Sequence, residues 1–131
     1  MQVNLSMVLE QVGKDKGIDP RILSQALEQA VLTAAKKVFG FHRVLEAQFN
    51  KETGQVDLFL VCIVTEDEGM RGRDLPKQET EKYGLKAELG DELLFQIFYL
   101  EGDQEKALEQ EKKYGDLIDI HEPIKRFGRI A

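Results

Sequence analysis

The sequence of 131 residues lacks several features that would place it in a specialised class. Cys62 is its single cysteine, which excludes an internal disulfide framework and makes a reducing compartment the default. No apolar run approaches the ~20 residues of a membrane span. The first 17 residues are interrupted by charges and lack the apolar core and cleavage site of a secretory signal. We therefore predict a cytoplasmic protein without membrane contact.

Residues suited to catalysis or metal binding are also scarce. His42 and His121 lie far apart in the sequence, and no nucleophile elbow is present. One cysteine and two histidines are too few for a recognisable zinc site. The acidic run 66–68 lacks the alternating ligands of a calcium loop. Because no set of nucleophile, base and orienting residue can be assembled, we predict no enzyme, no metal and no cofactor.

The net charge of −6, from 24 acidic and 18 basic residues, argues against a domain that grips nucleic acid over its whole surface. The basic side chains that stand out form two clusters, Lys36, Lys37 and Arg43 in one and Lys125, Arg126 and Arg129 in the other. Lysines near a helix end also stabilise the helix dipole without any partner. If the fold brings the two clusters together, they form a local phosphate-contacting patch. The sequence leaves both readings open.

A hydrophobic content of 42% supports one packed domain, organised around a long helix over residues 19–40. Asp19 is suited to the N-cap, Pro20 to the first helical position and Gly40 to the stop. The apolar side chains of this helix recur at the spacing of one buried face: Leu23, Leu27, Ala30, Val31, Ala34 and Val38.

A shorter amphipathic helix is predicted over residues 4–14, joined to the long one as an αα-hairpin. Its apolar stripe consists of Leu5, Val8, Leu9 and Val12. We interpret this stripe as core that packs on the long helix, and keep the alternative that it is a partner site.

Alternating patterns predict strands over 43–50, 55–65 and 92–100, the first two joined as a hairpin. The middle strand is apolar on both faces, so it is either a central strand or one whose outer face meets a partner. Cys62 lies among its aliphatic side chains and is predicted to be buried, with a raised thiol pKa. A short helix over 76–83, capped by Asp74, completes an α+β domain with a three-stranded sheet.

The segment 103–114 is charged nearly all round and predicts an extra helix near the C-terminus that is solvated or only weakly docked. The residues after it, 117–121, are ambiguous. Since the chain stops on Arg-Ile-Ala, we expect it to be part of a longer protein.

Five segments in order carry a resemblance to a known family: VGKDKGIDP, ALEQAVLTAAKK, NKETGQVDLF, ELGDELLFQI and FGRIA. Over residues 5–96 and 127–131 the chain resembles the N-terminal domain of the bacterial transcription elongation, termination and antitermination factor NusA. The resemblance implies one polymerase-binding domain over 1–131. Residues 126–131 would then start a connector to an OB-fold domain and two KH RNA-binding domains. Family members pass almost directly from the third strand to FGRIA, so we interpret 100–125 as a surface insertion.

The resemblance implies docking on bacterial RNA polymerase, at the β-subunit flap near the RNA exit channel, to modulate pausing, termination and antitermination. Lys36, Lys37 and Arg129 match family positions that face the nascent RNA hairpin. Leu32 falls on the otherwise polar side of the long helix, and we hypothesise that Leu32 and Met7 help form an apolar groove for the flap tip. The alternative function is a stand-alone RNA-binding protein without polymerase contact, whose affinity for free RNA would depend steeply on salt.

Overall fold

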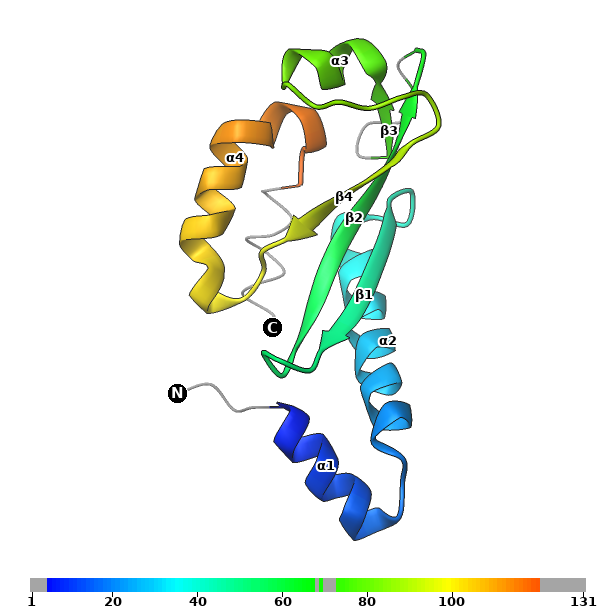
Figure 1. The fold of residues 1–131 in the computed structure, drawn as a ribbon, viewed down its shortest axis with the longest axis vertical. Coiled ribbons are helices and arrows are strands. Elements are labelled where there is room, and N and C mark those ends of the chain that lie inside the picture. Colours follow the sequence, from blue (N-terminus) through cyan, green and yellow to red (C-terminus); the bar gives the residue numbers. More distant parts are fainter. Residues whose placement is uncertain (1–4, 68, 70–72, 121–131) are drawn as a thin grey trace.

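The computed structural model describes residues 5–67, 69 and 73–120 of the chain. In chain order the elements are α1 (Leu5–Lys16), α2 (Pro20–Phe39), β1 (Val44–Asn50), β2 (Gln55–Thr65), β3 (Asp74–Pro76), α3 (Lys77–Lys82), β4 (Glu92–Ile97), a 3-10 turn (Glu101–Asp103) and α4 (Gln104–Ile118) (Figure 1). Helices and one sheet make up an α+β fold, as the sequence predicted.

The long helix α2 begins and ends where the sequence predicted. A carboxylate oxygen of Asp19 accepts a hydrogen bond from the backbone N–H of Arg21 at 2.9 Å, which satisfies a free donor of the first turn. At the other end Gly40 takes a φ of 99°, and its N–H donates to the carbonyl of Lys36. Local chemistry at both termini therefore sets the length of this helix.

The buried face of α2 differs from the predicted stripe. Ala35 and Phe39 are fully buried, whereas Ala30, which the stripe included, is exposed. Leu32 packs partly buried against the core instead of lying on a polar side. Ala35 and Phe39 follow Leu32 by three and seven residues, so all three share one helical face. Compared with the predicted stripe, the buried face of the helix is shifted towards Leu32, because the sheet covers that side.

β2 is the central strand, one of the two roles that its apolar faces predicted. It pairs antiparallel with β1 along one edge and antiparallel with β4 along the other, so that Phe59 lies between Glu46 and Gln96. Cys62 in this strand is fully buried, and burial raises the pKa of its thiol to about 12. Its predicted burial is confirmed.

The prediction of three strands was incomplete, because the sheet has four. The fourth strand, β3, pairs in parallel with residues 63–65 of β2 and buries Leu75. Asp74 belongs to this strand and does not cap α3, whose N-cap position is held by Pro76 without a side-chain hydrogen bond. A strand of three residues contains a single alternation of inward and outward side chains, which is too little pattern to detect in a sequence.

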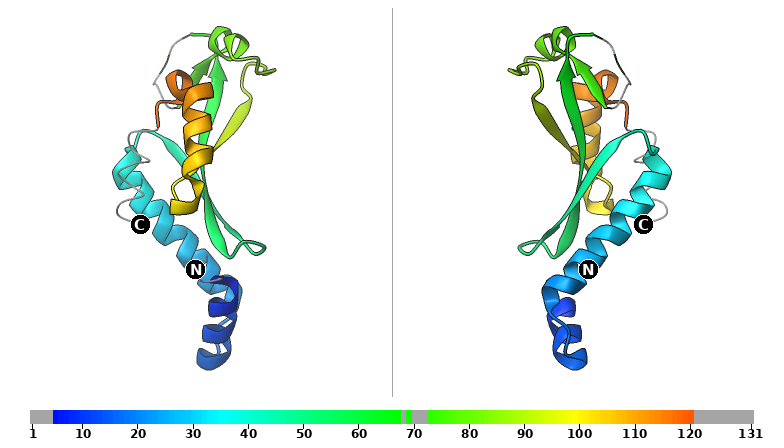
Figure 2. Two further views of the ribbon diagram at one scale, coloured as in Figure 1. Left: turned by 90° about the vertical axis from the view of Figure 1, so that its left-hand side faces the viewer. Right: turned by 90° about the vertical axis from the view of Figure 1, so that its right-hand side faces the viewer.

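Helices cover one face of the sheet. The largest buried cluster joins α2, the inner faces of β1, β2 and β4, and α4, through Ala35, Phe39, Leu45, Leu58, Leu60, Phe95, Ile97, Leu117 and Ile118. Figure 2 shows α2 and α4 on the same side of the sheet, with α3 at its upper end. None of the helices in the described residues has the length and apolar character needed to cross a membrane.

The extra helix α4 is a docked element, and the prediction of a solvated or weakly docked helix is wrong for its C-terminal half. It runs to Ile118, four residues beyond the predicted end, and Leu117 and Ile118 are buried. The ring of Tyr114 lies 5.8 Å from that of Phe95 on the sheet. The predicted segment ended at Tyr114, before Leu117 and Ile118, so the sequence analysis missed the buried end of the helix.

Candidate protein and RNA interface

The α1–α2 hairpin carries a surface of exposed apolar side chains, which we call the hairpin surface: Met7, Val8, Val12, Ile18 and Ile22. Met7 is 68% exposed and Ile22 is 59% exposed. α1 packs chiefly against α2 and lies beyond the end of the sheet in Figure 1. Clustered apolar exposure of this kind is typical of a protein interaction site.

This arrangement bears on the interpretation of the apolar stripe of α1. The helix α1 and its antiparallel connection to α2 are confirmed, but Val8 and Val12 remain 41% and 38% exposed. The stripe that we interpreted as core is therefore only partly covered by α2 at these two positions. The choice between core packing and a partner site stays a prediction.

Local chemistry holds the hairpin in shape. The carbonyl of Gly13 accepts a hydrogen bond from the N–H of Ile18 at 3.0 Å, and a Cβ added at Gly13 would lie 2.7 Å from the carbonyl oxygen of Ile18. Gly13 therefore allows the backbone of Ile18 to approach α1 closely near the end of this helix. Asp19 and Arg21 then form a surface ion pair at 2.9 Å, and the hydrogen bond from Arg21 lowers the pKa of the Asp19 carboxyl.

The two residues hypothesised to line an apolar groove differ in their surroundings. Met7 lies on α1 and is mostly exposed, whereas Leu32 is partly buried against the core beneath α2. The side chain of Leu32 is thus engaged inside the domain, and little of it is free for a partner. Ile18 and Ile22 are exposed on the same hairpin and were not singled out from the sequence. The sequence did offer a signal for Ile22: it is an apolar residue that lies outside the predicted apolar stripe of α2, and it is exposed.

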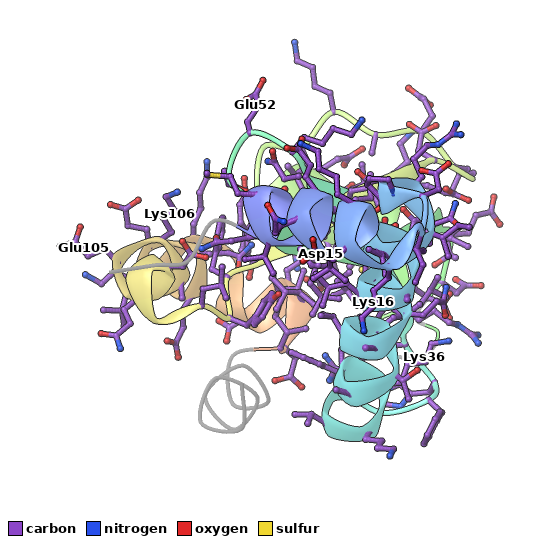
Figure 3. All side chains as sticks on the ribbon, turned by 90° about the horizontal axis from the view of Figure 1, so that it is seen from below. Asp15, Lys16, Lys36, Glu52, Glu105 and Lys106 are labelled. Atoms are coloured by element: carbon purple, nitrogen blue, oxygen red, sulfur yellow. The ribbon has the colours of Figure 1, made fainter. Side chains whose placement is uncertain are left out.

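Lys36 and Lys37 lie in the last turn of α2, at the end of the helix that is remote from the hairpin surface. The fourteen residues from Ile22 to Lys36 correspond to about 21 Å along the helix axis. Neither lysine has a carboxylate within salt-bridge distance among the described residues. Figure 3, seen from the α1 end, shows Lys36 on α2 on the opposite side from Glu105 and Lys106 of α4.

Arg43 belongs to the same basic cluster in the sequence, but its surroundings in the fold differ from those of Lys36 and Lys37. It precedes β1 and is half-buried, and its Nε and Nη1 atoms are buried without a hydrogen-bond partner among the described residues. Desolvation lowers the pKa of its guanidinium, and the charge of Asp119 opposes that shift. Arg43 is therefore poorly placed to contact a phosphate directly.

Arg129 and the predicted connector 126–131 lie outside the described residues, so the meeting of the two basic clusters stays a prediction. The prediction that 100–125 is an insertion also remains untested, although α4 within it contributes to the core. Within the described residues, no group of three or more His, Cys, Asp or Glu side chains is arranged to hold a metal ion.

Comparisons with known proteins identify the family. The model of the family described as NusA N-terminal domain matches residues 4–131. The chain is 30% identical over 91 residues to the transcription termination/antitermination protein NusA of Rickettsia conorii, covering 70% of this chain and 18% of that protein. It is 25% identical over 118 residues to the protein of that name from Bacillus subtilis, covering 90% of this chain and 25% of that protein.

The fold is also similar to that of a solved structure. The solution structure of the N-terminal domain of NusA from B. subtilis matches with a TM-score of 0.61 at 19% identity, covering 86% of this chain and 95% of that one. The chain spans about a fifth to a quarter of the length of the curated relatives it matches. The family model accounts for nearly every residue, and we conclude that the chain belongs to the NusA N-terminal domain family.

Proposed function

We propose that this chain is the RNA polymerase-binding module of a transcription termination and antitermination factor, acting in the cytoplasm without catalysis or a cofactor. The hairpin surface docks on the flap of the β subunit, near the RNA exit channel. The observation that supports this function best is the exposure of Met7 and Ile22 on a helical hairpin that projects beyond the packed sheet. In the longer protein, OB-fold and KH domains follow and bind RNA.

The chemistry of the hairpin surface suits a helical partner. An amphipathic helix can bury its own apolar stripe against exposed apolar side chains of two antiparallel helices. Met7, Val8 and Ile22 supply flexible and branched apolar contacts at the exposed rim. Burying a side chain such as Ile22 contributes roughly 1.5–3 kcal/mol relative to leaving it exposed.

The lysine pair supports a second contact, with the nascent RNA hairpin. Lys36 and Lys37 lie about 21 Å along α2 from Ile22, so one rigid helix links a protein-binding end to a cationic end. Lysines that contact phosphates position a nucleic acid without reading its sequence. Arg129 would add a third cation if the last residues of the chain return to this end of α2.

The docking proposal is tested with a purified flap fragment of the cognate polymerase and a Met7→Glu, Ile22→Glu double variant. We expect binding to weaken at least tenfold, because two charges must then be buried in an apolar contact. Leu108→Glu is the matched control, since Leu108 is 55% exposed on α4, and it should bind as the natural chain does. Unchanged binding by the double variant would exclude the hairpin surface as the contact.

The hypothesised contribution of Leu32 to flap binding needs a separate experiment. A Leu32→Glu change would also disturb the core, so loss of binding has to be compared with thermal stability. Leu32→Met preserves apolar volume and should leave both properties nearly unchanged. Loss of binding by Leu32→Glu at unchanged stability would establish a direct contact.

The RNA contact is tested with a Lys36→Glu, Lys37→Glu variant in hairpin-stimulated pausing assays. We expect weaker pausing while flap binding survives, because the lysines are remote from the hairpin surface. Lys112→Glu, an exposed charge reversal on α4, is the control. If the isolated chain instead bound free RNA at physiological salt with a steep salt slope, a stand-alone RNA-binding function would replace this one.

A further inference from the structure

The outer face of the sheet, opposite α2 and α4, carries an apolar row whose two ends are exposed. The strand register aligns Val44 of β1, Val61 of β2 and Leu94 of β4 directly across the sheet. Val44 is 43% exposed and Leu94 is 55% exposed, and they flank Val61, which is 4% exposed. Ile63 follows on the same face of β2 and is 36% exposed. This row is separate from the hairpin surface on α1 and α2.

Carboxylates surround the row. On the same face, the register places Glu46 beside Phe59 and pairs Ile63 with both Glu92 of β4 and Asp74 of β3. No lysine or arginine occurs among the strand residues that point to this face. Arg73 forms an ion pair with Asp74 at 3.4 Å, so the negative charge that the rim offers is that of the exposed Glu46 and Glu92. A partner that covers the row and carries positive charge gains from these two carboxylates.

The free edges of the sheet are partly occupied by helix side chains. The backbone N–H of Phe49 on β1 donates to Glu28 of α2 at 3.1 Å, and the carbonyl of Gln96 on β4 accepts from the side chain of Gln110 of α4 at 2.8 Å. Both backbone groups point away from β2 and would otherwise be available to an added strand. A partner is therefore favoured on the outer face and hindered at the edges.

We infer that the outer face is a second protein-docking surface, which takes a basic amphipathic helix of another protein. The apolar stripe of that helix covers Val44, Val61 and Leu94, and its lysines or arginines meet Glu46 and Glu92. RNA does not fit, because its phosphates would face the carboxylate rim. A second copy of this chain is disfavoured for the same reason, since two acidic rims would oppose each other.

The test uses the complete 131-residue chain, labelled with ¹⁵N, and a synthetic helical peptide of leucines and lysines in amphipathic spacing. The matched probe has the same leucines with glutamate in place of lysine. We expect the lysine peptide to shift the amide signals of β1, β2 and β4, and the glutamate peptide to shift none. Binding should weaken as salt is raised.

Two variants locate the site. Leu94→Ser should weaken binding of the lysine peptide roughly tenfold, whereas Leu108→Ser should change it less than twofold; both leucines are 55% exposed. Glu92→Lys should weaken binding several-fold and reduce its salt dependence. The Met7→Glu, Ile22→Glu variant should bind the peptide normally, which separates this surface from flap docking.

Three results would overturn the inference. In the first, the peptide shifts only signals of α1 and α2. In the second, Leu94→Ser and Leu108→Ser weaken binding equally. In the third, sedimentation shows a dimer that Leu94→Ser dissociates, which would assign the face to a second copy of the chain.

Discussion

The two ends of α2 belong to regions with opposite packing. In its C-terminal half, Ala35 is fully buried and belongs to the same core cluster as Leu58 and Leu60 of the sheet and Ile118 of α4. Around its N-terminal half, the hairpin surface leaves apolar side chains such as Ile22 in solvent. One helix thus has a half that contributes buried side chains to the core and a half that contributes none, although Glu28 in the second of these still accepts a hydrogen bond from β1.

The difference shows that apolar periodicity alone does not decide burial. α1 and α2 both carry apolar residues at helical spacing, yet only the half of α2 that faces the sheet has a second layer to cover it. Most of the stability should therefore come from the sheet region, whereas the hairpin remains available for binding. The predictions below test that division, from the largest expected effect to the smallest.

Leu60→Ala should lower the free energy of unfolding by about 4 kcal/mol, because Leu60 is fully buried at the centre of the sheet. Met7→Ala, in the exposed part of the hairpin, should change it by less than about 0.5 kcal/mol. Chemical denaturation measures both values. Similar losses in the free energy of unfolding for the two variants would show that the hairpin contributes as much to stability as the sheet.

Ile118→Ala should lower the free energy of unfolding by about 3 kcal/mol, since Ile118 anchors α4 in the core. Leu108→Ala, earlier on the same helix and 55% exposed, should cost less than about 0.5 kcal/mol. A negligible effect of Ile118→Ala in thermal or chemical unfolding would restore the interpretation of α4 as a peripheral helix.

Gly13→Ala should destabilise the hairpin by about 1 to 2 kcal/mol, because the new Cβ would meet the carbonyl oxygen of Ile18 at 2.7 Å and the backbone must shift. Hydrogen exchange should show faster exchange in α1, with protection of β2 unchanged. Gln11→Ala, exposed on the same helix, is the control. Faster exchange throughout the sheet would show that the two regions unfold together.

The Cys62 thiol should react with dithionitrobenzoate at pH 8 only when the chain unfolds, because burial raises its pKa to about 12 and hides the sulfur. Its pKa in the unfolded chain is near 8.5, so the unfolded state loses its proton first as pH rises. This thiol therefore lowers stability only above about pH 9, and has no effect at neutral pH. Rapid reaction of the native protein would contradict a closed core.

The sequence was a good guide wherever the cause is local. Asp19 and Gly40 set the two ends of α2 through their own side chain and backbone. The β1–β2 hairpin follows from alternation and a turn that ends in Gly54, whose φ of 71° suits glycine. The placement of Lys36 and Lys37 in the last turn followed in the same way.

By itself, then, the sequence determined the α+β class, the two N-terminal helices, the β1–β2 hairpin and the family. Only the tertiary structure decided that Leu32 faces the core, that the end of α4 is buried, that Asp74 joins a fourth strand, and that Val8 and Val12 stay partly exposed. These outcomes depend on which surfaces meet after the chain folds. Contacts between residues far apart in the sequence leave no periodic pattern in either segment, so burial and exposure had to be read from the packed molecule.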